Sequence, residues 1–273
     1  MTKASWARAG ASAAACGLVC AAVMGLYTEL SRASNDAVVQ RRIRSHRYSA
    51  VALDYFVLFN PESVITEVDR VVPGKARAFF DIWRNRQFEY SWLRSLTQRY
   101  VDFFAVTEDA LVFAASSMDV QLTESQRRRI MDAYLELKPW PDTAAALRRL
   151  KAANVRIVAL ANFSPMMLRA NADHAGLSSL FEALVSKDES RTYKPDPRAY
   201  QLGVAHLALT KEEIVFAAFG GWDPAGAKSF GYPTVWVNRF NQPPEQLSVT
   251  ADRTVRDLDG LVDFVLSSQD ANQ

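Results

Sequence analysis

Residues 52–60 read ALDYFVLFN, and Asp54 is the only charged residue between Arg47 and Glu62. The residues before Asp54 are apolar, as in a buried β-strand. A carboxylate at the end of such a strand is costly to remove from water unless a cation or several backbone N–H groups face it. Asp54 is therefore either a structural residue that accepts hydrogen bonds from the following turn or a nucleophile that neighbouring positive charge keeps ionised.

Short apolar runs alternate with amphipathic stretches from Tyr48 onward, which is typical of βαβ units and a parallel sheet. The predicted strands are 49–53, 155–161, 183–186, 214–219 and 234–237. The predicted helices are 142–153, 165–175, 197–207, 224–230 and 258–266. This order predicts an α/β fold with a Rossmann-like, doubly wound parallel sheet.

The interval between the first two predicted strands has helical character, and apolar residues recur at helical spacing through 77–96. Helices inserted after the first strand would cover the carboxyl ends of the strands, where open α/β sheets bind ligands. We therefore predict a core domain over 48–60 and 139–273 and an all-helical cap domain over 61–138. Asp54 would lie on the floor of the site between them.

Polar residues follow three further predicted strands. Asn162 follows the second strand, Lys194 lies in a proline-rich turn after the third, and Asp223 follows the fourth. Helix capping or a rigid turn explains each of them singly. Together with Asp54 they place four polar groups at successive strand ends, which chance capping explains poorly.

Composition narrows the function further. The chain has 273 residues, of which 49% are hydrophobic, enough for one large domain or a domain with an insert. The formal net charge is +2 with acids and bases interleaved, which argues against a nucleic-acid partner. Both cysteines, Cys16 and Cys20, lie near the N-terminus, so the rest of the chain offers no disulfide, thiolate metal site or cysteine nucleophile.

Residues 1–47 have the pattern of a targeting segment followed by a linker. Basic residues outnumber the acids there, and 9–28 carries no charge. Ser31-Arg32-Ala33 then offers small residues where a signal peptidase would cleave. We predict a signal peptide and an exported, periplasmic protein. The uncharged stretch is also about long enough to span a bilayer, so a membrane anchor at this segment is the alternative.

Several longer motifs resemble a known family. They read WRNRQFEYSWLRSLTQRYVDF, DHAGLSSLFE, YKPDPRAY and WDPAGAKSFGYPTVWVNR. In these motifs the chain resembles the haloacid dehalogenase-like superfamily, and within it the type II (S)-2-haloacid dehalogenases, from Tyr48 to Leu266. The resemblance implies hydrolysis of a small 2-haloalkanoic acid through an aspartyl ester, with no cofactor, by a protein that is often a homodimer.

The resemblance also implies a role for each site residue. Asp54 would attack C2 of the acid, and Arg84 would face the departing halide. Lys194 would keep Asp54 ionised, and Asp223 would help to activate the water that hydrolyses the ester. The residues expected to contact the substrate or line its pocket are Asn162, Tyr200, Trp222 and Phe56. Because Phe56 stands where phosphatase relatives carry the second Asp of a magnesium site, no metal is expected.

The chain departs from the family pattern around Asp54. The Gly-Thr turn that usually follows the nucleophile is missing, and Ala161 and the segment AFGG at 218–221 lack polar contacts of the family. Losing one preorganised donor can cost on the order of a hundredfold in rate. We therefore expect an altered substrate or weak activity. The alternative is a catalytically degenerate, exported binding or scaffold module on the same fold. The retained charges favour the enzyme, because unpaired buried charges cost stability.

Overall fold

The computed structural model describes residues 48–267, so the predicted signal or anchor segment lies outside the described residues. Within 48–267, no helix combines the length and the apolar character that a membrane span requires.

A six-stranded sheet, parallel at every pairing, forms the centre of the described chain, in the order β3-β2-β1-β4-β5-β6. Its strands are β1 Ala50–Leu53, β2 Arg156–Ala161, β3 Ala183–Ser186, β4 Ile214–Ala218, β5 Thr234–Val237 and β6 Arg253–Val255. The strand order reverses between β1 and β4, which is the point where open α/β sheets bind ligands. The predicted fold class is confirmed.

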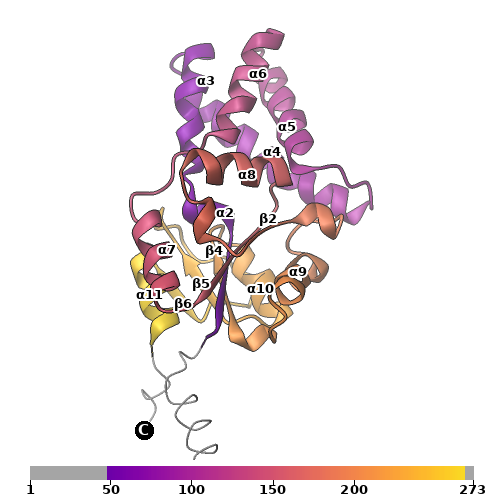
Figure 1. Cartoon of the computed structure of the whole chain (residues 1–273). Helices are drawn as coiled ribbons and strands as arrows, with labels where there is room; N and C mark the ends of the chain where they lie inside the picture. Colours follow the sequence, from indigo (N-terminus) through magenta and orange to yellow (C-terminus); the bar gives the residue numbers. More distant parts are fainter. Residues whose placement is uncertain (1–47, 268–273) are drawn as a thin grey trace, which may run out of the picture. The chain divides into compact units, whose positions relative to one another are not determined.

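Helices cover both faces of this sheet. Val51 and Leu53 of β1 belong to the core on the face that carries α7 (Thr143–Ala152) and α11 (Leu258–Leu266). Ala50 and Ala52 point to the opposite face, which carries α9 (Pro197–Leu207) and α10 (Asp223–Phe230), and Figure 1 shows these two pairs on opposite sides. Burial on both faces explains why the strands read as continuous apolar runs. A further helix, α8 (Pro165–His174), follows β2.

The helices between β1 and β2 gather at one end of the sheet (Figure 1). They are α3 (Ile65–Val71), α4 (Ala76–Leu96), α5 (Phe103–Ser117) and α6 (Glu124–Asp132). Polar contacts join α4 to α5: Trp83 Nε1 donates to Thr107 O at 2.8 Å, and Gln87 Nε2 donates to Thr107 Oγ1 at 2.7 Å. The division into two domains at 61 and 139 stays a prediction.

One strand was missed by the sequence analysis. β6 has two exposed residues and one partly buried one, and its pairing with β5 places it at the edge of the sheet. A short strand of this kind shows no apolar run, and charged side chains are common at sheet edges.

A single helical turn, α2 (Tyr55–Leu58), follows β1 directly. Asp54 caps it, because Asp54 Oδ1 accepts a hydrogen bond from Phe56 N at 2.9 Å. At the other end, Arg239 Nη2 donates to Val57 O at 2.8 Å and pairs with the Asp142 carboxylate at 2.9 Å. We call the two contacts of Arg239, with Val57 O and with the Asp142 carboxylate, the Arg239 tie. The turn after β1 is therefore held at both ends.

Candidate active site

Three charged side chains meet at the carboxyl ends of the strands. Asp54 follows β1, Asp223 begins α10 after β4, and Lys194 lies in the turn before α9. Lys194 Nζ lies 2.5 Å from Asp54 Oδ2 and 2.6 Å from Asp223 Oδ2. Lys194 is fully buried, and Asp54 and Asp223 are only 9% and 1% exposed. The structure thus brings these three predicted residues together as a buried carboxylate–ammonium–carboxylate cluster.

The charges in this cluster depend on one another. Burial by itself lowers the pKa of Lys194, but the Asp223 and Asp54 carboxylates outweigh burial and raise the pKa above its ordinary value. Burial raises the pKa of Asp223, and the nearby Asp54 charge adds to this, while Lys194 opposes both. Asp223 is therefore a stronger base than an exposed aspartate.

The remaining carboxylate oxygens also have partners. Asp54 Oδ1 caps α2 as described above, so the structural explanation of Asp54 and its pairing with a cation are both realised, one at each oxygen. Asp223 Oδ1 accepts a hydrogen bond from Tyr200 Oη at 2.6 Å. Tyr200 is fully buried behind Asp223 and is not among the residues that line the cavity, where the sequence placed it.

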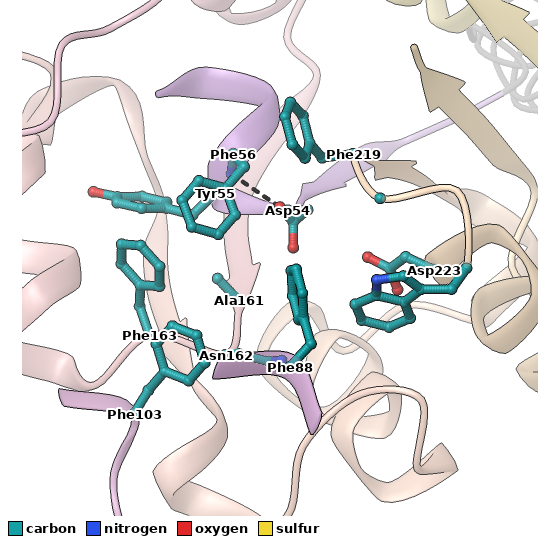
Figure 2. A pocket seen from close by; sticks show the side chains of 12 residues that line it. Asp54, Tyr55, Phe56, Phe88, Phe103, Ala161, Asn162, Phe163, Phe219 and Asp223 are labelled. Atoms are coloured by element: carbon teal, nitrogen blue, oxygen red, sulfur yellow. Dashed lines mark hydrogen bonds between the residues drawn. The ribbon is translucent and has the colours of Figure 1, made fainter. Parts of the chain in front are cut away.

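A small closed cavity adjoins Asp54 and Asp223, with a volume of about 10 Å³. That volume is room for about one water molecule. Figure 2 shows the Asp54 carboxylate pointing into a space surrounded by phenyl rings. The lining residues are Asp54, Tyr55, Phe56, Phe88, Phe103, Ala161, Asn162, Phe163, Phe219, Gly220, Trp222 and Asp223.

Three predicted pocket residues lie at this cavity: Phe56, Asn162 and Trp222. The Asn162 side chain also fixes the turn that carries Lys194, because Asn162 Oδ1 accepts from Lys194 N at 3.2 Å.

Arg84 does not line the cavity. Its guanidinium carbon lies 4.0 Å from the ring centroid of Phe56 and 4.4 Å from that of Phe88, and both rings belong to the cavity wall. Arg84 Nη1 donates to Gln87 Oε1 at 2.7 Å. Arg84 also lines an open recess of about 640 Å³ outside the cavity. The predicted contact with a departing halide therefore requires that one of these two rings move.

Part of the aromatic wall was not predicted from the sequence. Phe88 comes from α4, Phe103 begins α5, and Phe163 follows β2. A signal existed for Phe88, because residues four apart lie on the same face of a helix, and Phe88 follows Arg84 at that spacing. Phe103 and Phe163 had no such signal, since their position depends on how the insert packs on the sheet.

The residues present do not form an evident metal site. In the part of the chain that the structure describes, no group of three or more acidic, histidine or cysteine side chains could hold a metal ion. Independence from metal stays a prediction of the sequence.

Comparison with known proteins adds to this geometry. A family model of haloacid dehalogenase-like hydrolases matches residues 22–231. The (S)-2-haloacid dehalogenase of Pseudomonas sp. (strain YL) is 39% identical over 215 residues, which cover 78% of this chain and 93% of that protein. Haloacetate dehalogenase H-2 of Moraxella sp. (strain B) is 35% identical over 220 residues, which cover 80% of this chain and 98% of that protein.

Solved structures agree with these relatives. An L-2-haloacid dehalogenase structure matches with a TM-score of 0.79 at 33% identity, covering 81% of this chain and 99% of that one. The L-2-haloacid dehalogenase from Xanthobacter autotrophicus, solved with chloropropionic acid covalently bound, matches with a TM-score of 0.76 at 33% identity, covering 80% of this chain and 98% of that one. With its parallel sheet, its buried Asp–Lys–Asp cluster and these matches, the chain belongs to the haloacid dehalogenase-like hydrolase family.

Proposed function

We propose that this protein is a hydrolase that releases halide from a small 2-haloalkanoic acid through an aspartyl-ester intermediate. The observation that carries the proposal is the position of Asp54, whose Oδ2 lies 2.5 Å from the buried Lys194 ammonium at the wall of a closed cavity. A carboxylate that a neighbouring cation keeps ionised can act as a nucleophile. Relatives that are dehalogenases by name support the same reaction.

In the first step, Asp54 Oδ2 forms a bond to C2 of the acid. The C2–halogen bond breaks with inversion at C2, and its electron pair leaves with the halide. The phenyl rings around Asp54 leave room for about one water molecule beside the nucleophile before the acid arrives. We assign halide departure to Arg84, which lies behind Phe56 and Phe88 and reaches the leaving group once one of these rings moves.

In the second step, water attacks Cγ of the Asp54 ester. Asp54 Oδ1 is the carbonyl oxygen of that ester, and Phe56 N–H already donates to it at 2.9 Å. This N–H therefore faces the oxygen on which negative charge develops. Asp223 takes the proton of the attacking water, and its raised pKa suits a general base. The Cγ–Oδ2 bond then breaks, and the departing oxygen takes the proton from Asp223 and becomes the hydroxyl of the 2-hydroxy acid. Asp54 releases the second proton of the water to solvent and is again a carboxylate.

We also propose that the helical insert acts as a cap. Phe88 of α4 and Phe103 of α5 complete the cavity wall above Asp54, so displacement of α4 or α5 would open the cavity to solvent. A cavity of about 10 Å³ must open in some way before any haloacid enters. Export to the periplasm and a homodimer stay predictions of the sequence.

A single-turnover experiment in oxygen-18 water tests the reaction. Excess full-length protein is mixed with chloroacetate, and the peptide that contains Asp54 is analysed by mass spectrometry. Because water attacks Cγ, the label is expected in the Asp54 carboxylate and not in the first product formed. Label found only in the product hydroxyl would mean that water attacks C2 directly.

The Asp54→Asn protein is the control for labelling. It should release no halide and acquire no oxygen-18 at position 54. If the unaltered protein releases no halide from any 2-haloacid while Asp54→Asn binds the acids equally well, the binding module is the better reading.

A further inference from the structure

One side chain lines both the cavity beside Asp54 and an open recess next to it. The cavity beside Asp54 has a volume of about 10 Å³, and the recess next to it has about 640 Å³. Among the described residues, Phe219 alone lines both spaces. Figure 2 shows the Phe219 ring close to Phe56 at the edge of the cavity. The Phe219 ring thus lies at the boundary between the cavity and the recess, and we call it the partition.

This partition has a fixed backbone. Trp236 Nε1 donates to Phe219 O at 2.9 Å, which holds the main chain where β4 ends. The Phe219 ring lies between two others, with centroids 5.8 Å from that of Phe56 and 5.8 Å from that of Phe240. Phe219 is only half-buried. Its ring is therefore held at the boundary by the fixed main chain and by two neighbouring rings.

The other walls give the cavity little room to grow. Phe103 and Phe163 are fully buried in the core, and Asp223 is held by Lys194 and Tyr200. A cavity that holds about one water must gain space for any haloacid, and each further carbon needs more. Phe219 is the described wall residue that itself also lines a large open space.

The recess also offers a route for an acid. Arg77 in its wall is paired with Glu62 and Asp81. Arg84 also lines the recess and forms no salt bridge with any residue in 48–267, and its guanidinium packs on the rings of Phe56 and Phe88. An anion entering the recess therefore meets an unpaired cation beside the partition.

We propose that Phe219 determines which chain lengths of 2-haloacid the site accepts, an inference that rests on the proposed function. With the ring in place, the site takes two-carbon haloacids such as chloroacetate and excludes 2-haloacids with longer chains. Without the ring, the cavity and recess join, and the chain beyond C2 extends into the recess.

The test compares two phenylalanines of the recess wall. The unaltered full-length protein, Phe219→Ala and Phe240→Ala are assayed for halide release from chloroacetate and from (S)-2-chlorohexanoate. Phe219→Ala is expected to raise the ratio of kcat/KM for the longer acid over the shorter one at least tenfold, a change on the scale of a few methylene contacts. Phe240→Ala enlarges only the recess, so the ratio should stay that of the unaltered protein. Phe219→Leu should give an intermediate ratio and serves if the alanine variant does not fold.

Binding separates this inference from the reaction itself. In the Asp54→Asn protein, calorimetry measures the affinity for both acids without turnover, with and without Phe219→Ala. Halide release from chloroacetate with no change in the ratio would overturn the role of Phe219 and leave the dehalogenase intact. A shifted binding ratio without halide release in the unaltered protein would overturn the reaction and keep the role of Phe219. Equal affinity for both acids in Asp54→Asn, or no binding of either, would overturn the chain-length limit.

Discussion

Two buried lysines follow β3, and they differ in what surrounds the ammonium group. Lys194 and Lys187 are both fully buried. Lys194 contacts two carboxylates, and their charges raise its pKa despite burial. Lys187, in the short 3-10 helix Lys187–Glu189, donates to the backbone carbonyl of Ala199 at 2.5 Å. Burial, with repulsion from Lys194, holds the pKa of Lys187 well below its ordinary value.

The difference shows that burial without a carboxylate in contact lowers the pKa of a lysine, and that two carboxylates in contact raise the pKa despite burial. Lys194 therefore stays protonated because Asp54 and Asp223 contact it, and the two buried carboxylates in turn have Lys194 as their cation. Substitutions at both lysines and at the residues around them test this comparison.

The largest effect is expected from Asp54→Asn, which removes one of the two charges that set Lys194 apart from Lys187. Halide release should fall on the order of 10⁴-fold or more, the scale of removing a nucleophile. The initial rate of chloride release with chloroacetate measures the loss. A variant that keeps a tenth of the activity would show that the attacking group lies elsewhere.

The same substitution at each lysine gives the sharpest contrast in stability. Lys194→Met leaves two carboxylates facing each other without a cation, and removing one partner of a buried ion pair typically costs about 3–5 kcal/mol. Lys187→Met replaces a lysine that has no charged partner in contact, so it should change the free energy of unfolding much less. Urea denaturation at neutral pH measures both. Equal losses would mean that the carboxylates are not what distinguishes the two sites.

Tyr200→Phe removes the hydrogen bond that Tyr200 Oη donates to Asp223, on the side of Asp223 away from Lys194. It leaves Asp223 Oδ1 without its donor, which typically costs about 1–3 kcal/mol. The Tyr200 hydrogen bond lowers the pKa of Asp223, so its loss raises that pKa and moves the acidic limb of the kcat profile to higher pH. The control is Tyr232→Phe, which removes a hydrogen bond to Tyr200 O in the same aromatic cluster but touches no carboxylate. If the acidic limb of the kcat–pH profile moves equally in both variants, the hydrogen bond from Tyr200 has no specific effect on the pKa of Asp223.

The smallest effect is a pH dependence of stability. The folded protein holds the pKa of Lys187 below 10.5, so the unfolded chain binds more protons between that lowered pKa and 10.5. Across this window the free energy of unfolding should rise with pH in the unaltered protein relative to Lys187→Met, by less than about 1.4 kcal/mol per pH unit. The raised pKa of Lys194 acts in the opposite sense, since its stabilisation is complete below 10.5 and is lost above. Denaturation at pH 7 and pH 9.5 measures the difference, and parallel curves would contradict the assignment.

Most of the sheet was predictable from the sequence because the residues that end each strand and helix lie next to it in the chain. The strands Ala183–Ser186 and Thr234–Val237 and the helix Pro197–Leu207 begin and end where the apolar pattern predicted them. Asp, Pro and Gly residues at the loops mark these ends by their own backbone preferences. The edge strand β6 carries no such pattern and was missed.

The site was predictable where it follows from topology. Asp54, Lys194 and Asp223 meet because parallel strands end at one edge of a sheet, whatever the side chains around them. Tyr200 was misplaced because a helix has several faces, and its spacing from Lys194 does not tell which face meets the cavity. Lys187 gave no signal, since a lysine after a strand is ordinarily solvated. The cavity volume follows from packing between distant segments, which pattern alone does not contain.

The Arg239 tie has a consequence for biosynthesis. A ribosome makes Asp54 and its helical turn early, but the guanidinium that holds the carbonyl of Val57 comes 182 positions after it. Asp142 accepts a hydrogen bond from the same Arg239 guanidinium, and it also accepts one from Leu258 N at the start of α11. A nascent or truncated polypeptide that stops before Arg239 lacks this support for the turn after Asp54, so the turn gains its second support only after β1 to β5 have been synthesised.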